Sequence, residues 1–235
     1  MKKILALVAI VATFVSCCNC GKQEAATANF DKFNSVVYEL NIRQATVEGT
    51  FAAAEKYLPE LKEMGVDIVW LMPISPIGVD GRKGTLGSYY SIKDYTAVNP
   101  EFGTADDLRA FISAAHAMGI RVLLDWVANH TARDARWVTE RAADWYERDE
   151  NGVAKVPWDW TDTAKLNYAN HDVWRGHIDA MRYWVEEFKV DGFRCDMAML
   201  VPIEFWQEAS AELHRIKPDL FMLAEAEEDN LFDRA

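Results

Sequence analysis

The chain has 235 residues, of which half are hydrophobic, and its formal net charge at pH 7 is −12. This length is enough for one sizeable domain with its own hydrophobic core. The strong negative charge argues against binding to nucleic acid or to anionic membrane surfaces, and it is compatible with a neutral ligand such as a glycan.

The N-terminus has the pattern of an export signal. Two lysines precede a short apolar run over residues 4–15, which is too short to span a bilayer comfortably. We expect a signal peptide over residues 1–16, a polar tether over 17–30 and a globular part over 31–235. The residues up to Cys17 resemble a bacterial lipobox, so Cys17 is expected to carry lipid; ordinary secretion with cleavage nearby is the alternative. The protein is thus expected to be exported to the periplasm, outer membrane or surface of a bacterium, and to touch the membrane only through this lipid anchor.

Short apolar runs alternate with helix-length amphipathic segments along the rest of the chain. They predict strands over 36–42, 66–72, 120–127, 190–196 and 220–225, and helices over 51–64, 104–118, 171–188 and 202–216. The second strand is continuously apolar, as in a parallel strand that is covered on both faces. This alternation predicts an α/β fold with a parallel sheet.

Three of these strands end on polar, titratable residues. Asp125 lies near the end of the third strand, Arg194 and Asp196 end the fourth, and Glu225 ends the fifth. Because residues i and i+2 of a strand share a face, Arg194 and Asp196 point to the same side, whereas Cys195 points into the core. Strand ends of this kind meet at one rim of a β/α barrel, where the active sites of such barrels lie.

Several ordered blocks resemble the α-amylase family, glycoside hydrolase family 13. These blocks are 65–74, 87–95, 125–130, 164–170 and 192–198, together with the strand that ends at Glu225. The resemblance covers about residues 36–235 and implies a TIM (β/α)8 barrel with a small subdomain inserted after the third strand, at about 131–168. A complete barrel has eight strands, and the pattern here predicts five. We therefore expect the N-terminal part of a catalytic barrel, truncated after about strand five and without the family's third acidic residue, an aspartate further along.

The strand ends suit the cleavage of a glycosidic bond. Cleavage with retention of configuration needs one ionised carboxyl group as nucleophile and one protonated carboxyl group as acid. Asp196 suits the first role, because the neighbouring Arg194 is expected to lower its pKa. Glu225 suits the second role, because its apolar neighbours are expected to raise its pKa.

The resemblance implies roles for further residues. Tyr90 would stack on the sugar ring, His130 would hydrogen-bond the sugar at the cleavage point, and Asp125 would support the site from the third strand. Arg194, beside the nucleophile, completes the predicted substrate-binding set. Asn129 would be a ligand of a structural calcium ion, the only cofactor expected. From the residues alone, the tyrosine could instead pack its loop, and the asparagine could be an ordinary hydrogen-bonding residue.

The predicted insert is rich in tryptophan. Trp137, Trp145, Trp158 and Trp160 all lie between the third strand and the helix at 171–188. They could hold a glycan against the site, or they could pack a small irregular lobe. The sequence leaves both interpretations open.

The function that these patterns predict is that of a retaining glycoside hydrolase acting on α-glucans such as starch or maltodextrin. Its partner is then an α-glucan oligosaccharide or polysaccharide, and no nucleic acid is expected. Two alternatives stay open: an α-glucan transferase or isomerase of the same fold, and a glycan-binding protein without catalysis. A fragment of the barrel could also be inactive by itself.

Overall fold

The computed structural model describes residues 34–227. The predicted signal peptide, Cys17 and the tether at 17–30 lie outside the described residues. None of the helices within residues 34–227 combines the length and the apolar character that a membrane-spanning segment needs.

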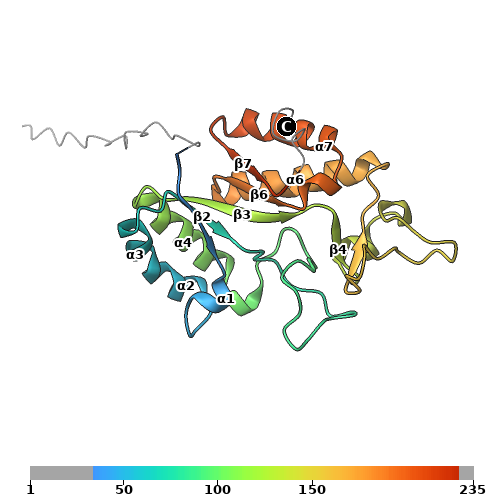
Figure 1. The fold of residues 1–235 in the computed structure, drawn as a ribbon, viewed down its shortest axis with the longest axis horizontal. Coiled ribbons are helices and arrows are strands. Elements are labelled where there is room, and N and C mark those ends of the chain that lie inside the picture. The colour runs from blue at the N-terminus through green and yellow to red at the C-terminus, as the bar shows by residue number, and fades with distance from the viewer. Residues whose placement is uncertain (1–33, 228–235) are drawn as a thin grey trace, which may run out of the picture. The chain divides into compact units, whose positions relative to one another are not determined.

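A parallel sheet of five strands forms the centre of this part of the chain (Figure 1). Its strands are β1 (Val37–Leu40), β2 (Ile68–Leu71), β3 (Arg121–Val127), β6 (Gly192–Asp196) and β7 (Phe221–Ala224). They lie side by side in chain order, each parallel to the next. The five predicted strands and their parallel arrangement are therefore confirmed.

Helices connect the strands and cover the sheet. They are α1 (Ile42–Ala45), α2 (Phe51–Ala54), α3 (Leu58–Glu63), α4 (Ala105–Ala117), α6 (His171–Phe188) and α7 (Ile203–Ile216). Figure 1 shows α4 beside β2 and β3, and α6 and α7 beside β6 and β7. The first strand is shorter than predicted, because the carbonyl oxygen of Asn41 accepts a hydrogen bond from Ala45 N at 2.8 Å, which starts α1.

The helix predicted over 51–64 is divided into α2 and α3 by a 3-10 turn at Glu55–Tyr57. Pro59 lies in the first turn of α3. A proline has no N–H to donate, and its ring crowds the carbonyl group four residues earlier, so it is disfavoured inside a helix and accepted at the start of one. Gly65, with a φ angle of 84°, ends the segment as predicted.

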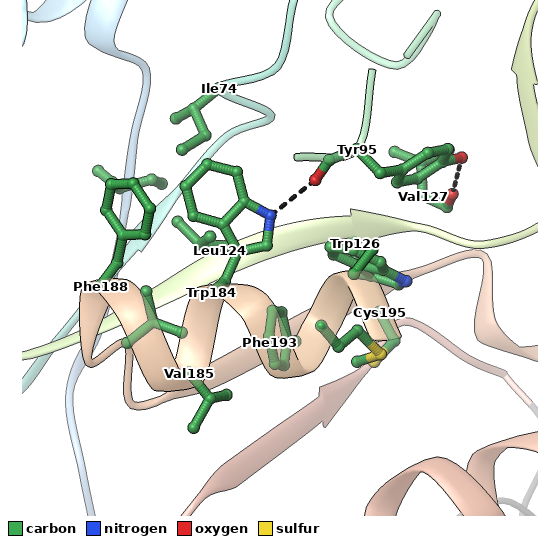
Figure 2. Packing of buried hydrophobic residues seen from close by; sticks show 14 of the residues in the cluster. Ile74, Tyr95, Leu124, Trp126, Val127, Trp184, Val185, Phe188, Phe193 and Cys195 are labelled. Carbon is green, nitrogen blue, oxygen red and sulfur yellow. Dashed lines mark hydrogen bonds between the residues drawn. The ribbon is translucent and has the colours of Figure 1, made fainter. Parts of the chain in front are cut away.

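Helix α6 packs its apolar face against β3 and β6 (Figure 2). Trp184 is buried and donates from Nε1 to the carbonyl oxygen of Tyr95 at 2.7 Å. The Tyr95 hydroxyl lies 2.6 Å from Val127 O and 2.8 Å from His130 O. Tyr95 therefore ties the helix to the turn that leaves β3. Cys195 is buried in the same core, as the alternation along β6 predicted.

The insert leaves the sheet after β3 and projects beyond the end of that strand (Figure 1). It contains the antiparallel pair β4 (His130–Ala132) and β5 (Thr163–Lys165) and the short helix α5 (Arg136–Glu140). Trp137 and Trp145 are buried, with ring centroids 5.2 Å apart. Packing of the lobe therefore accounts for these two tryptophans, whereas Trp158 is 64% exposed.

Candidate active site

The polar ends of β3, β6 and β7 meet at one edge of the sheet. Asp125 of β3 is in register with Arg194 of β6, and Arg194 is in register with Leu223 of β7. Asp196 is the last residue of β6, and Glu225 directly follows β7. The structure thus brings together the four charged residues that the sequence analysis singled out.

Arg194 is the centre of this cluster. Its Nη1 atom lies 3.0 Å from both carboxylate oxygens of Asp125 and 3.1 Å from Oδ1 of Asp196, and its Nη2 atom lies 2.8 Å from Oε2 of Glu225. Glu225 also accepts a hydrogen bond from Met197 N at 2.8 Å. One buried guanidinium group therefore holds three carboxyl groups from three neighbouring strands by charge-assisted hydrogen bonds.

Two aromatic side chains contact the cluster. Trp70 of β2 donates from Nε1 to Asp125 Oδ2 at 3.0 Å, and the guanidinium group of Arg194 lies 4.6 Å from the centre of its ring. The Tyr90 hydroxyl lies 3.4 Å from the same oxygen, and burial raises the pKa of Tyr90, so the hydroxyl stays a donor. Sequence reasoning missed Trp70. The sequence did contain a signal for it. Trp70 has a polar N–H group and lies two residues before the end of the predicted strand 66–72, which leads to the same rim.

The pKa of Asp196 differs from the prediction. Burial raises it, Arg194 lowers it and the carboxyl group of Glu225 raises it again, with a net pKa of about 6. Arg194 lowers this pKa as predicted, but burial, which the sequence analysis did not include, outweighs the ion pair and leaves the pKa raised. Asp125 follows the same pattern, since burial outweighs Arg194 and raises the pKa of Asp125 to about 7. A pKa of about 6 still leaves Asp196 mostly ionised at pH 7.

The surroundings of Glu225 also differ from the prediction. Its side chain is 42% exposed and is ion-paired with Arg194, so it does not lie in an apolar setting. The physical reason is that successive side chains of a strand point in opposite directions, so the apolar residues beside Glu225 in the sequence are not what its carboxyl group contacts. Asp196 and Glu225 both contact Arg194, which places both at the same rim as predicted.

A cavity of about 370 Å³ opens at this rim, within the usual range of ligand pockets. Five of the predicted site residues line it: Tyr90, His130, Arg194, Asp196 and Glu225. The other lining residues, which the site prediction did not include, are Lys83, Ser88, Trp160, Asp162, Thr163 and Met197. Asp125 does not line this cavity, because its side chain is fully buried against Arg194.

His130 and Asn129 lie at the turn after β3. His130 is buried, and this burial lowers its pKa to about 4, so its ring is neutral at pH 7. Asn129 is also buried, and its Nδ2 atom lies 3.3 Å from His130 Nδ1. Within residues 34–227, no group of three or more acidic, histidine or cysteine side chains could hold a metal ion. Calcium also accepts amide and backbone carbonyl oxygens as ligands, which such groups do not include, so the role of Asn129 as a calcium ligand stays a prediction.

Comparison with known proteins identifies relatives of this arrangement. Residues 34–232 match the family model described as the alpha amylase catalytic domain. The alpha-amylase MalA of Haloarcula japonica is 34% identical over 185 residues, which are 74% of this chain and 27% of the relative. The alpha-1,4-glucan:maltose-1-phosphate maltosyltransferase of Rhodospirillum rubrum is 34% identical over 214 residues, which are 80% of this chain and 31% of the relative.

Solved structures have the same architecture. An alpha-amylase from Lactobacillus plantarum matches with a TM-score of 0.80 and 41% identity, over 85% of this chain and 47% of that one. The maltogenic alpha-amylase AmyB from Thermotoga neapolitana matches with a TM-score of 0.79 and 41% identity, over 86% of this chain and 48% of that one. The chain thus spans about half the length of these solved structures and less than a third of the two curated relatives. The predicted fold, a partial TIM-type barrel, is confirmed, and the chain belongs to the α-amylase family.

Proposed function

We propose that this chain supplies the catalytic centre of a retaining glycoside hydrolase that acts on α-glucans such as starch or maltodextrin. The observation that carries the proposal is the placement of Asp196 and Glu225, which come from neighbouring strands and contact the same Arg194. Two carboxyl groups this close suit direct attack on the sugar, because an inverting enzyme needs more room between them for a water molecule. The relatives named as alpha-amylases support the substrate class.

The two carboxyl groups have different roles in this mechanism. Asp196 attacks the anomeric carbon and forms a covalent glycosyl intermediate, while Glu225 gives a proton to the leaving oxygen. Glu225 then takes a proton from the water molecule that releases the sugar. Tyr90 and His130 line the same cavity, where the tyrosine ring packs against the sugar and the neutral histidine hydrogen-bonds its hydroxyl groups.

Glu225 has to change its surroundings during this cycle. Its carboxyl group contacts Arg194 in the free site, whereas the acid role requires a protonated Glu225 beside the leaving oxygen. In our proposal, the bound glycosidic oxygen takes Glu225 away from Arg194, and Glu225 then donates its proton to that oxygen. Asp125 contacts Arg194 through both carboxylate oxygens and keeps the guanidinium group in place when the other pair opens.

Two variants of nearly unchanged shape test these roles in the full-length protein. Asp196→Asn should lower kcat on starch by roughly a thousandfold or more, because it removes the nucleophile. Glu225→Gln should slow the hydrolysis of starch far more than that of an α-glucosyl fluoride, whose leaving group needs no proton. Glu227→Gln removes a charge from an exposed side chain nearby and should leave both rates unchanged. Retained starch hydrolysis in Asp196→Asn, or equal losses on both substrates in Glu225→Gln, would contradict the assignment.

A second candidate is an α-glucan transferase of the same fold. The relative named as a maltosyltransferase and the relative named as an amylase are each 34% identical to this chain. Both reactions pass through a glycosyl intermediate, which either water or a sugar hydroxyl group can then attack. Chromatography of the products with added maltose distinguishes them, since an excess of lengthened chains over hydrolysis products favours the transferase. Binding of maltoheptaose without turnover would favour a glycan-binding protein.

We also propose that the protein is exported and held in a bacterial envelope by lipid on Cys17. The proposal rests on the positive start, the short apolar run and the lipobox-like residues that precede Cys17. Globomycin, which inhibits the processing of lipoproteins, should cause the unprocessed precursor to accumulate. Release of unmodified protein into the medium would refute the anchor and leave ordinary secretion.

A further inference from the structure

The backbone turns sharply directly after the proposed nucleophile. Met197 follows Asp196, the last residue of β6, and has φ and ψ angles of 44° and 45°. This left-handed conformation is uncommon for residues other than glycine, because it places the Cβ atom too close to a carbonyl oxygen. Lys189, which also has a positive φ angle, directly follows helix α6, where this conformation is common. Met197 instead joins a strand to a 3-10 turn at Ala198–Leu200, so the end of a helix does not account for it.

The turn at Met197 lets two successive N–H groups bind the proposed acid. Met197 N donates to Glu225 Oε2 at 2.8 Å, and Ala198 N donates to Glu225 O at 2.9 Å. In an extended strand, successive N–H groups point in opposite directions, whereas in a left-handed turn they point to the same side. The conformation of Met197 is therefore what brings both N–H groups to Glu225.

Neighbouring hydrogen bonds fix this turn. Glu225 N donates to Cys195 O at 3.0 Å, which continues the pairing of β7 with β6. On the other side of the turn, Trp206 of α7 donates from Nε1 to Ala198 O at 3.0 Å. A strained backbone conformation persists only where the surrounding structure holds it, and such conformations cluster at active sites. The turn at Met197 meets both conditions.

The Met197 hydrogen bond and the Arg194 ion pair end on the same oxygen of Glu225. Arg194 Nη2 lies 2.8 Å from Oε2, the atom that also accepts from Met197 N. The two contacts respond differently when Glu225 is protonated. The ion pair loses its charge attraction, because a protonated carboxyl group is neutral, whereas the hydrogen bond from a neutral N–H group to the carbonyl oxygen of that carboxyl group remains. The N–H group of Met197 is thus the contact that can hold Glu225 throughout the reaction.

We propose that Met197 is a positioning residue for the acid, because its left-handed backbone holds Glu225 beside the leaving oxygen when the ion pair with Arg194 opens. The inference rests on the proposed function and gives the strained turn a role in it. The role belongs to the backbone of residue 197 and not to its side chain. It therefore requires a residue that tolerates a positive φ angle, and it does not require methionine itself.

Substitutions at residue 197 of the full-length protein test this role with two substrates. Starch needs a proton from Glu225, whereas an α-glucosyl fluoride does not. Met197→Val introduces a β-branched side chain, which rarely adopts a positive φ angle, so it should lower kcat/KM on starch roughly a hundredfold and on the fluoride far less. Met197→Gly tolerates the angle and should keep the native ratio of the two kcat/KM values. Met199→Val is the matched control, because Met199 lies in the adjoining 3-10 turn and has no positive φ angle, and it should also keep the native ratio.

Two results would overturn the role of Met197. In the first, Met197→Val keeps the native ratio of the two kcat/KM values, either because nothing changes or because both fall equally; an equal fall would mean that the substitution acts on the nucleophile or on folding. In the second, Met197→Gly loses starch hydrolysis as selectively as Met197→Val, so that the side chain is responsible and the backbone is not.

Two further outcomes are also decisive. If Met197→Val does not fold, Met197→Gly and Met197→Asn decide, because both glycine and asparagine tolerate the angle. A native ratio in both variants then supports the role, and a selective loss of starch hydrolysis in either refutes it. If the native protein hydrolyses neither substrate, the proposed function is refuted, and the role of Met197 fails with it. A native protein that hydrolyses both substrates, with a ratio that Met197→Val leaves unchanged, supports the hydrolase and refutes only the role of Met197.

Discussion

Replacement of Glu225 by glutamine should move the acid limb of the pH profile as well as slow the reaction on natural substrates. Burial and the Glu225 carboxyl group raise the pKa of Asp196, Arg194 lowers it, and the net pKa is about 6. Glutamine has nearly the shape of glutamate without its charge, so Glu225→Gln removes one of the upward contributions. Because Asp196 must be ionised to attack, the midpoint of the acid limb should lie at lower pH in the variant.

The expected size follows from the ionised fraction of Asp196. With a pKa of about 6, the carboxyl group is about 90% ionised at pH 7 and about 10% ionised at pH 5. The kcat/KM of the native protein should therefore fall roughly tenfold between pH 7 and pH 5. In Glu225→Gln the fall should be smaller, because more of Asp196 stays ionised at pH 5.

The assay measures kcat/KM for an α-glucosyl fluoride across the acid limb. This substrate needs no proton from Glu225, so the variant keeps measurable turnover. Glu227→Gln loses the same charge from an exposed side chain two residues further along, and it should keep the native midpoint. If the profile of Glu225→Gln coincides with the native one, Glu225 does not set the pKa of Asp196 and the reasoning is refuted.

Three further variants test the packing around the site through the free energy of unfolding in denaturant. Trp70→Phe removes the hydrogen bond to buried Asp125 and should cost about 1–3 kcal/mol; an unchanged free energy would mean that this bond contributes nothing. Gly176→Ala should cost about 1–3 kcal/mol although alanine is the better helix former, because a Cβ atom there would lie 2.5 Å from Cη2 of Trp145; a stabilised variant would contradict this packing. Burial lowers the pKa of His177 to about 3, so the unfolded chain binds a proton that the folded chain does not, and stability is lost as pH falls from 6.5 towards 3, by up to about 1.4 kcal/mol per pH unit. In His177→Phe, the free energy of unfolding should depend less steeply on pH. If the native protein and the variant give parallel curves of unfolding free energy against pH, His177 does not cause this loss of stability.

The position of the site was predictable because its signals are local. Asp125, Arg194, Asp196 and Glu225 each lie near the end of a short apolar run, and in a parallel sheet such ends meet at one rim. The partners of these residues were not predictable in the same way. The bond from Trp70 to Asp125 joins residues 55 positions apart, and only the pairing of β2 beside β3 brings them together.

The protonation states were not predictable because they depend on burial. The sequence placed Arg194 two residues before Asp196 and so indicated the direction of one effect on the pKa. The larger effect comes from the surface that Asp196 loses on folding, which no neighbour in the sequence reveals. Glu225 shows the converse, since its apolar neighbours in the sequence are not what its exposed carboxyl group contacts.

The excess of negative charge around Arg194 links the stability of the site to the proposed chemistry. Three carboxyl groups contact one guanidinium group, so the cluster is negatively charged overall when all are ionised. The pKa values of Asp125 and Asp196 are raised by burial and by repulsion from neighbouring carboxyl groups, so full ionisation is costly in the free protein. During glycosidic cleavage the sugar becomes positively charged as the transition state forms. The positive charge on the sugar offsets the repulsion between the carboxyl groups, and it is present only as the transition state forms. The repulsion that makes ionisation costly in the free site therefore favours the transition state over the bound substrate.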